Sequence, residues 1–219
     1  ETIFSALLRL KVLIRLGIVN CINVIIYRIK VKTGRYKKNM PIQKIKIPEC
    51  IYKNSEYESI EDRFISKSFL KEAEAIQKGT LRLFNKSLTI ENYPPKWFKD
   101  PLSENKFADQ KTHWSSCNYK LYSDIKIGWE LSRWQWALTL ARAYRYTLNP
   151  NYLQTIEDWT KDWCVKNPVN SGINWSCGQE VSIRLINALM TWKILDGCNG
   201  APNITRKRAE FTIAHLKRI

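Results

Sequence analysis

The sequence predicts a mainly α-helical fold that contains one small β-hairpin. From Ile125 onward, apolar residues recur at helical spacing in runs of about 15 to 20 residues that short turns join. Upstream, apolar residues alternate through TLRLFNKSLTI around Asn85 and Lys86, as is typical of a two-stranded hairpin. Apolar residues make up 44% of the 219 residues, which is enough for a buried core. We therefore expect antiparallel helix pairs in the second half and little sheet elsewhere.

The first half of the chain combines basic and apolar segments. Apolar residues dominate its beginning, and the segment that follows is rich in Lys and Arg and ends at Pro41. Further on, Ser55 suits a helix N-cap and Gly79 suits a helix stop. The predicted elements are one or two helices over residues 3–31, a basic loop over 32–41, a short strand over 42–48 and a helix over 55–78.

The second half begins with an aromatic loop and continues as four helices. Residues 91–114 contain three Pro and several aromatic residues, and we expect an ordered loop because Trp and Phe need burial or a ligand. One apolar stripe runs through Tyr152, Ile156, Trp159 and Trp163. The predicted helices cover residues 125–147, 151–165, 177–195 and a segment that starts near 204.

The chain is strongly basic, with a net charge of +16. Residues 1–48 contain eleven Lys and Arg against a single Glu, so the excess is concentrated there. A basic surface of this kind implies a polyanionic partner, namely nucleic acid, anionic lipid or acidic polysaccharide. Because no nucleic-acid-binding motif is present, we expect no nucleic-acid partner.

The apolar beginning of the chain is too short to span a membrane. Its longest uncharged run, from Leu16 to Tyr27, has 12 residues, whereas a membrane span needs about 20. No signal-peptide cleavage site is evident. Two interpretations stay open: an interfacial helix that places residues 3–46 on an anionic membrane surface, or a helix packed on the domain.

The cysteines do not suggest a metal site. The six Cys residues include no CxxC pair, so we expect neither a metal nor a cofactor. In a chain of this length most of them are expected to be free, buried thiols. They are Cys21, Cys50, Cys117, Cys164, Cys177 and Cys198.

Aromatic and charged side chains cluster near the starts of two predicted helices. They are Trp129, Glu130, Arg133 and Trp134 in one segment, and Asn174, Trp175, Glu180 and Arg184 in the other. Residues four apart share a helix face, so Glu180 and Arg184 could form a simple helix ion pair worth about 0.2–0.5 kcal/mol. The Trp residues could equally be core residues. The alternative is a cleft, because helix N-termini attract anions and Trp faces stack on sugars.

These segments resemble the N-terminal helical domain of the heparinase II/III-like family. The matching pieces are WELSRWQW, its continuation through ARAYRYTLNPNY, the helix end WCVKNP, and GINWSCGQEVSIR. The resemblance extends over residues 79–219 and is weak over 1–78. We therefore predict a basic N-terminal helical segment over 1–78 and a partial (α/α) toroid over 79–219.

The resemblance implies a polysaccharide lyase-like protein. Members of this family combine an incomplete (α/α) toroid with a C-terminal β-sandwich, which we do not find in this chain. They cleave uronic-acid-containing polysaccharides by β-elimination, using an Asn to neutralise the uronate and a Tyr and a His to transfer protons. The chain has no Asn-His pair, and its only histidines are His113 and His215. We therefore expect it to lack the catalytic residues.

The resemblance also implies a partner, a location and a binding site. The expected partner is an acidic polysaccharide, and the expected location is the periplasm or the cell surface. The alternative function is a non-catalytic binding or scaffold module in surface or capsular polysaccharide assembly. The residues that resemble those lining the cleft, which we predict to bind substrate, are Trp129, Glu130, Arg133, Trp134, Asn174, Trp175, Glu180 and Arg184.

Overall fold

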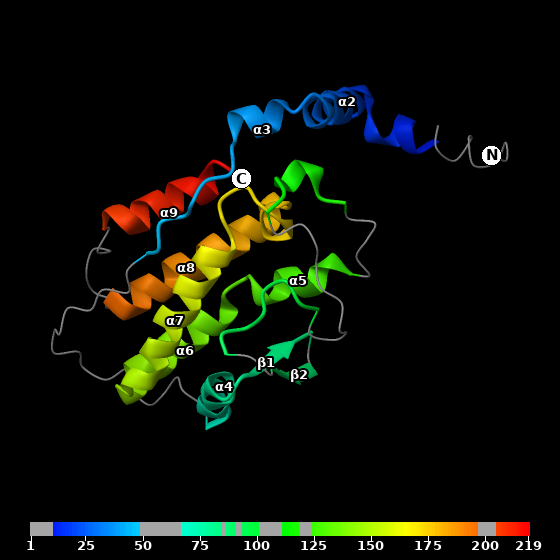
Figure 1. The fold of residues 1–219 in the computed structure, drawn as a ribbon. Coiled ribbons are helices and arrows are strands. Elements are labelled where there is room, and N and C mark those ends of the chain that lie inside the picture. The colour runs from blue at the N-terminus through cyan, green and yellow to red at the C-terminus, as the bar shows by residue number, and fades with distance from the viewer. Residues whose placement is uncertain are drawn as a thin grey trace. The chain divides into compact units, whose positions relative to one another are not determined.

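The chain divides into two compact units, Glu1–Pro41 and Ile42–Ile219. The computed structural model (Figure 1) describes residues 11–48, 67–84, 86–90, 93–100, 111–118, 124–196 and 205–219. Its described part is mainly helical, with one two-stranded antiparallel sheet, so the predicted fold class is confirmed. The predicted division of the chain between residues 78 and 79 stays a prediction.

The described part of the first unit is helical. Residues 11–16 form helical turns, Gly17 interrupts them at φ 78°, and helix α2 covers Ile18–Lys32. Gly34 then adopts a left-handed conformation and precedes a short helix, α3, at Arg35–Asn39. Glycine permits both turns because it has no Cβ to clash with the backbone. In the part of the chain that the structure describes, no helix is both long enough and apolar enough to cross a membrane.

Two predictions for the first 48 residues are wrong. The expected basic loop contains α3, where Lys and Arg have good helix propensity and Tyr36 packs against Tyr27 with ring centroids 5.7 Å apart. The expected strand over 42–48 is reduced to one isolated bridge between Gln43 and Val169. No ladder extends from it because Val169 itself lies in an irregular segment.

A helix and a hairpin open the described part of the second unit after residue 48. Helix α4 covers Lys67–Gln77, and strands β1 (Thr80–Leu83) and β2 (Lys86–Thr89) pair with Thr80 opposite Thr89. Gly79 connects α4 to β1 at φ 81°, and a Cβ there would lie 3.0 Å from the carbonyl oxygen of Ile90. The predicted hairpin is confirmed, as is the helix before it over its described residues. The predicted helical residues 55–66 lie outside the described part.

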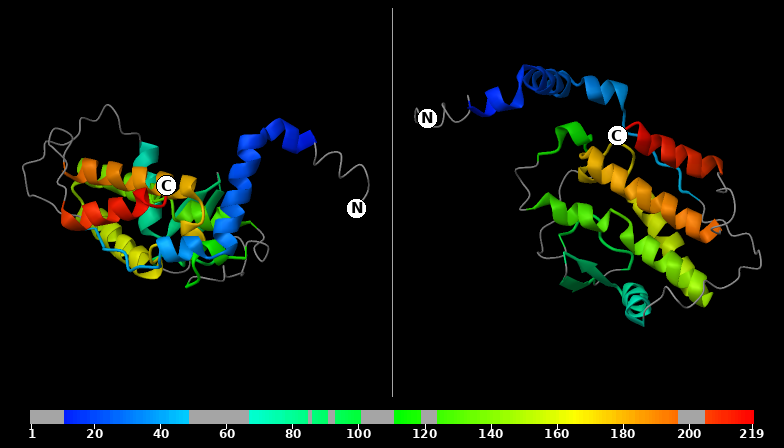
Figure 2. Two further views of the ribbon diagram at one scale, coloured as in Figure 1. Left: turned by 90° about the horizontal axis from the view of Figure 1, so that it is seen from above. Right: turned by 180° about the vertical axis from the view of Figure 1, so that it is seen from behind.

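Five helices follow in the described part of the chain and form the main body of the second unit. Helix α6 packs against α4, α7 and α8, and α8 packs against α9. Figures 1 and 2 show α6, α7, α8 and α9 running in alternating directions, so the expected antiparallel pairs are confirmed. The five helices are α5 (Ile125–Leu131), α6 (Gln135–Thr147), α7 (Pro150–Lys166), α8 (Gly178–Asp196) and α9 (Arg206–Leu216).

Local capping explains why α7 begins where the sequence predicts. The Asn149 side-chain oxygen accepts a hydrogen bond from the backbone N–H of Asn151 at 3.0 Å, and Pro150 occupies the first turn. Asn at the N-cap and Pro at the first helical position are both favoured there. The predicted stripe of this helix is buried, because Tyr152 and Trp159 are 3% and 0% exposed.

The core of the second unit is built largely from Trp rings. Eight of the nine Trp side chains of the chain are buried, and only Trp129 is half-buried. Ring centroids lie 5.0 Å apart for Trp136 and Trp159, and 5.4 Å apart for Trp134 and Trp163. Offset and edge-to-face contacts of this kind add about 0.5–1.5 kcal/mol per pair beyond area burial. Most Trp residues therefore act as packing residues.

The aromatic loop is ordered where the structure describes it. Trp97 is fully buried, and its indole Nε1 donates to the Asp162 carboxylate at 2.7 Å. Phe98 is also buried, and short 3-10 turns occur at Trp114–Ser116 (η2) and Ile173–Trp175 (η4). The prediction of an ordered loop is confirmed for residues 93–100.

Candidate functional site

The predicted site residues gather where α5 meets α6, next to η4 and the start of α8. They form an outer group, which reaches the surface, and an inner group, which lies in the core. The outer group is Trp129, Glu130, Arg133 and Glu180, with side chains of Glu130, Arg133 and Glu180 that are 11%, 24% and 8% exposed. The inner group is Trp134, Asn174, Trp175 and Arg184, each at most 1% exposed.

The chain bends sharply between α5 and α6, so the prediction of one continuous helix over 125–147 is wrong. Trp134 adopts a left-handed conformation with φ 63° and ψ 24°. Tertiary contacts hold this elbow, since the indole of Trp163 donates to Ser132 Oγ at 3.1 Å and Asn187 donates to the Arg133 carbonyl at 2.8 Å. The bend turns the Trp134 ring into the core, against Trp163 and Phe211. Residues 129–134 therefore do not lie along the face of a single helix.

Arg133 is the centre of the outer group. Its guanidinium donates to both carboxylate oxygens of Glu180, at 2.7 and 2.9 Å, and also to the Glu130 carboxylate. These bonds raise the pKa of Arg133, with the hydrogen bond to Glu180 as the largest cause. The alternative of a helix ion pair between Glu180 and Arg184 is wrong, because the Glu180 carboxylate accepts instead from Arg133, in the elbow between α5 and α6. One cation between two carboxylates leaves the outer group with a formal charge of −1.

Trp129 ties α5 to the neighbouring 3-10 turn. Its indole Nε1 donates to the carbonyl oxygen of Ile173 at 2.9 Å, and the side chain stays half-buried. Asn174, in the same turn, donates to the side-chain oxygen of Asn167 at 2.8 Å. These hydrogen bonds therefore preorganise the site. The bond from Trp129 joins residues that are 44 positions apart in sequence.

Arg184 occupies the centre of the inner group. Its Nε donates to His215 Nε2 at 3.0 Å, and one terminal nitrogen donates to the Asn174 carbonyl at 3.1 Å. The guanidinium carbon also lies 4.5 Å and 5.2 Å from the ring centroids of Trp163 and Trp175. Burial lowers the pKa of Arg184 to about 9. It therefore remains a cation at neutral pH, stabilised by oriented dipoles and aromatic faces.

His215 is a site residue that sequence reasoning did not single out. It comes from α9 and is fully buried, with its Nδ1 2.8 Å from the Phe211 carbonyl and its ring 4.8 Å from that of Trp175. Since Arg184 donates to Nε2, the neutral tautomer with the proton on Nδ1 satisfies both contacts. Burial, followed by the charge of Arg184, holds the pKa of His215 well below its usual value. No sequence motif around His215 indicates this role.

Acidification below about pH 6.5 is expected to destabilise the fold. Because the pKa of His215 is lower in the folded chain, the unfolded chain binds a proton there at a pH at which the folded chain does not. The contribution of His215 to stability is therefore fully present above its pKa in the unfolded chain. It is lost as the pH falls towards its pKa in the folded chain. The expected slope is about 1.4 kcal/mol per pH unit. Urea unfolding at several pH values between 7 and 5 measures it. His215→Gln, which keeps an acceptor without titrating, should flatten the slope, and an unchanged slope would contradict the assignment.

The other residues that the sequence offered as candidates are His113 and the cysteines. His113 is buried, and its Nδ1 lies 2.8 Å from Ser115 Oγ. None of the four described cysteines forms a disulfide, and Cys117 and Cys164 are buried, so the expectation of thiols is confirmed for these four. Cys50 and Cys198 lie outside the described residues. Within the described ranges, no group of three or more His, Cys, Asp or Glu side chains is placed to hold a metal ion.

Comparison with known proteins gives one finding. The family described as Heparinase II/III N-terminus matches residues 39–205. No curated protein and no solved structure gave a match. The matched range contains all eight predicted site residues and ends immediately before α9, which supplies His215.

Proposed function

Because the chain belongs to the heparinase II/III family as its N-terminal domain, we propose that it binds an acidic, uronic-acid-containing polysaccharide. The family match over residues 39–205 carries this proposal, and it identifies a module related to polysaccharide lyases. The mainly helical fold and the net charge of +16 support it. In this reading the helices form part of an incomplete (α/α) toroid, and a longer protein that contains them cleaves the polymer by β-elimination.

The eight predicted site residues differ in how accessible they are to a polymer. The outer group lies where a polymer could reach it, and Trp129 is half-buried. The side chains of Trp134, Asn174, Trp175 and Arg184 are buried here, which gives them a packing role. Their contact with substrate stays a prediction, as does the alternative of a non-catalytic module in surface or capsular polysaccharide assembly.

The two histidines are poorly placed for proton transfer to a substrate. His113 and His215 are 6% and 0% exposed, and each is engaged by neighbouring protein groups. A general acid or base must come within hydrogen-bonding distance of the proton that it transfers. We therefore propose that catalysis in the family's manner requires residues other than those that the structure describes.

The purified chain is expected to bind alginate or heparan-type polymers weakly and in a salt-sensitive manner. Exposed charges are screened within about 8 Å at physiological ionic strength, so binding should weaken as salt is added. Affinity electrophoresis in gels that contain the polymer, with neutral dextran as control, measures this. Ultraviolet absorbance should stay constant, because elimination would leave an absorbing unsaturated uronate. Equal retardation by dextran, or rising absorbance, would contradict the proposal.

A second function is favoured by the exposed surface of the first unit. Helix α2 has no buried residue, and Ile18, Ile22, Ile25 and Ile29 fall on one face at helical spacing while 49–80% exposed. Residues 11–41 also contain eight Lys and Arg and no Asp or Glu. A helix with an apolar stripe and flanking cations lies in the interface of an anionic membrane. We propose that α2 binds such a surface, as part of the segment 3–46.

Vesicle sedimentation should separate this function from polysaccharide binding. The chain is expected to bind vesicles that contain phosphatidylglycerol more strongly than neutral phosphatidylcholine vesicles. Ile22→Gln with Ile25→Gln should weaken binding about tenfold or more, because apolar side chains no longer enter the interface. Ile186→Gln with Ile213→Gln is the matched control, since both residues are exposed in the second unit. Equal losses in both double variants would refute the role of α2.

A further inference from the structure

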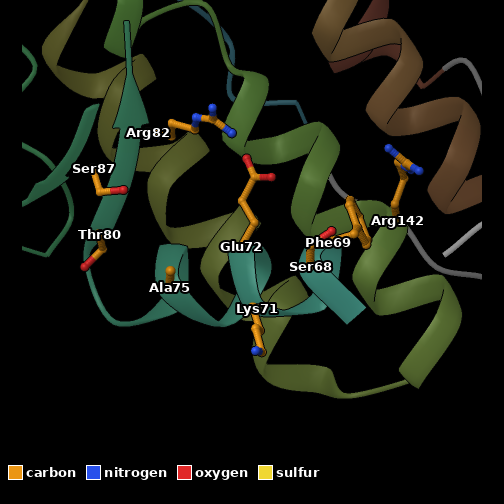
Figure 3. A pocket seen from close by; sticks show the side chains of 9 residues that line it. All are labelled: Ser68, Phe69, Lys71, Glu72, Ala75, Thr80, Arg82, Ser87 and Arg142. Carbon is orange, nitrogen blue, oxygen red and sulfur yellow. The ribbon is translucent and has the colours of Figure 1, made fainter. Parts of the chain in front are cut away.

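A groove between α4, the hairpin and α6 has not been assigned a role so far. Its volume is about 530 Å³, within the range of about 300–1,000 Å³ that is typical of small-ligand sites. Figure 3 shows Arg82, from β1, and Arg142, from α6, on opposite sides of the groove with Glu72 of α4 between them. Lys71 lines the edge of the groove. Three cations and one carboxylate give the lining a formal charge of +2.

The groove also contains groups that suit a sugar. Thr80 and Ser87 contribute hydroxyls from the two strands, and Phe69 contributes an aromatic ring. The Arg142 guanidinium carbon lies 4.3 Å from the centroid of that ring, so the cation is held over Phe69 by a cation–π contact. A uronate unit presents one carboxylate and several hydroxyls, and arginine is the side chain that best matches a carboxylate. The groove therefore matches an acidic monosaccharide unit in both charge and polarity.

The groove lies next to a smaller hollow that is lined in part by a residue of the candidate site. The hollow, of about 40 Å³, shares Glu72 and Arg82 with the groove, and Glu130 and Gln135 also line it. The groove and the outer group are therefore close enough, through Glu130, for successive units of one polymer to contact both. The outer group cannot neutralise a uronate by itself, because both its carboxylates already surround Arg133. The charge of an acidic polymer must be met next to this group rather than inside it.

We propose that this groove, which we name the Arg82–Arg142 groove, is a subsite that binds a uronate unit of an acidic polysaccharide. The proposal rests on the proposed function. Arg82 and Arg142 bind the carboxylate, Phe69 positions Arg142, and Thr80 and Ser87 hydrogen-bond to sugar hydroxyls. Because none of the residues of the outer group lines the groove, the subsite supplies binding and register rather than chemistry.

Isothermal titration of the full chain with an alginate hexasaccharide tests the subsite. Arg82→Gln with Arg142→Gln is expected to weaken binding at least about fivefold, because two charge contacts are lost. Arg142→Lys keeps the charge and should retain most of the affinity. Lys161→Gln with Lys217→Gln removes two exposed cations elsewhere in the second unit and should change binding less than about twofold. Circular dichroism and thermal melts confirm that each variant is folded.

The possible outcomes distinguish the subsite from the function on which it rests. Loss in the groove variant alone supports the subsite. If the wild-type chain binds and both double variants bind equally well, the subsite is wrong and the proposed function survives. If the wild-type chain binds the uronate hexasaccharide no better than neutral maltohexaose, both proposals are wrong.

Discussion

Replacing Arg184 with Ala is expected to lower the free energy of unfolding by about 3–5 kcal/mol. The side chain is 1% exposed and donates to His215 and to the Asn174 carbonyl. Its removal leaves these buried acceptors without a donor and opens a cavity between Trp163 and Trp175. Among the charged side chains of the site, this is the one whose loss affects the most neighbours.

Urea unfolding followed by far-ultraviolet circular dichroism measures this effect. Arg142→Ala is the matched control, since Arg142 is exposed and loses only its contact with Phe69, worth about 0.5–1 kcal/mol. Arg184→Lys keeps the charge but not the planar fork, so it should also be destabilised. A loss below about 1 kcal/mol for Arg184→Ala would show that the buried guanidinium does not organise the core.

Replacing Trp134 with Ala should be similarly costly, by about 3–5 kcal/mol, because a fully packed aromatic side chain is removed. The ring is 1% exposed and contacts Trp136, Trp163 and Phe211. The backbone adds a second expectation, because φ at this residue is 63°. Gly tolerates that conformation and Ala does not, so Trp134→Gly should be more stable than Trp134→Ala by about 1 kcal/mol.

Chemical denaturation of the wild-type chain, Trp134→Ala and Trp134→Gly in parallel tests both the cost of removing the ring and the order of the two variants. At an ordinary helical position the order of the two variants would be reversed, since Gly is worse than Ala there. Finding Ala more stable than Gly would contradict the left-handed elbow. Trp134→Phe retains most of the packing and allows a binding assay on folded protein. Loss of polysaccharide binding in that variant supports the predicted substrate contact, and unchanged binding assigns Trp134 to the core.

Local signals made much of the fold predictable. Asn149 and Pro150 mark the start of α7, and its apolar stripe is long enough to fix the helical period. The hairpin could be predicted from alternation, with Gly79 as a breaker before β1. Helix α3 was missed because its five residues carry no apolar period, and Gly34 resembles a loop residue in sequence.

The interior of the site could not be predicted in the same way. The residues of the elbow, Ser132 to Trp134, include neither Gly nor Pro, so no local rule ends a helix there. The partners that hold it, Trp163, Asn187 and Phe211, lie 29 or more positions away in sequence. For the same reason, spacing suggested that Glu180 pairs with Arg184, whereas the folded chain places Arg133 closer. The sequence therefore indicated which residues belong to the site, whereas tertiary contacts determine what each of them does.

The dependence of the elbow on α9 has a consequence for synthesis on the ribosome. Phe211 packs on Trp134, and His215 accepts from Arg184, yet the ribosome adds Phe211 77 positions after Trp134 and His215 31 positions after Arg184. Domains fold as their chain emerges, from the N-terminal side first. A nascent chain that has released α5 to α8 can already form the contacts of Trp163 and Asn187 with the elbow, but it still lacks Phe211 against Trp134 and His215 against Arg184, so its Trp-rich interior stays incompletely closed. Helix α9 therefore completes the packing of this interior only after α5 to α8 have been synthesised, and until then the uncovered Trp side chains are a surface of the kind that chaperones shield.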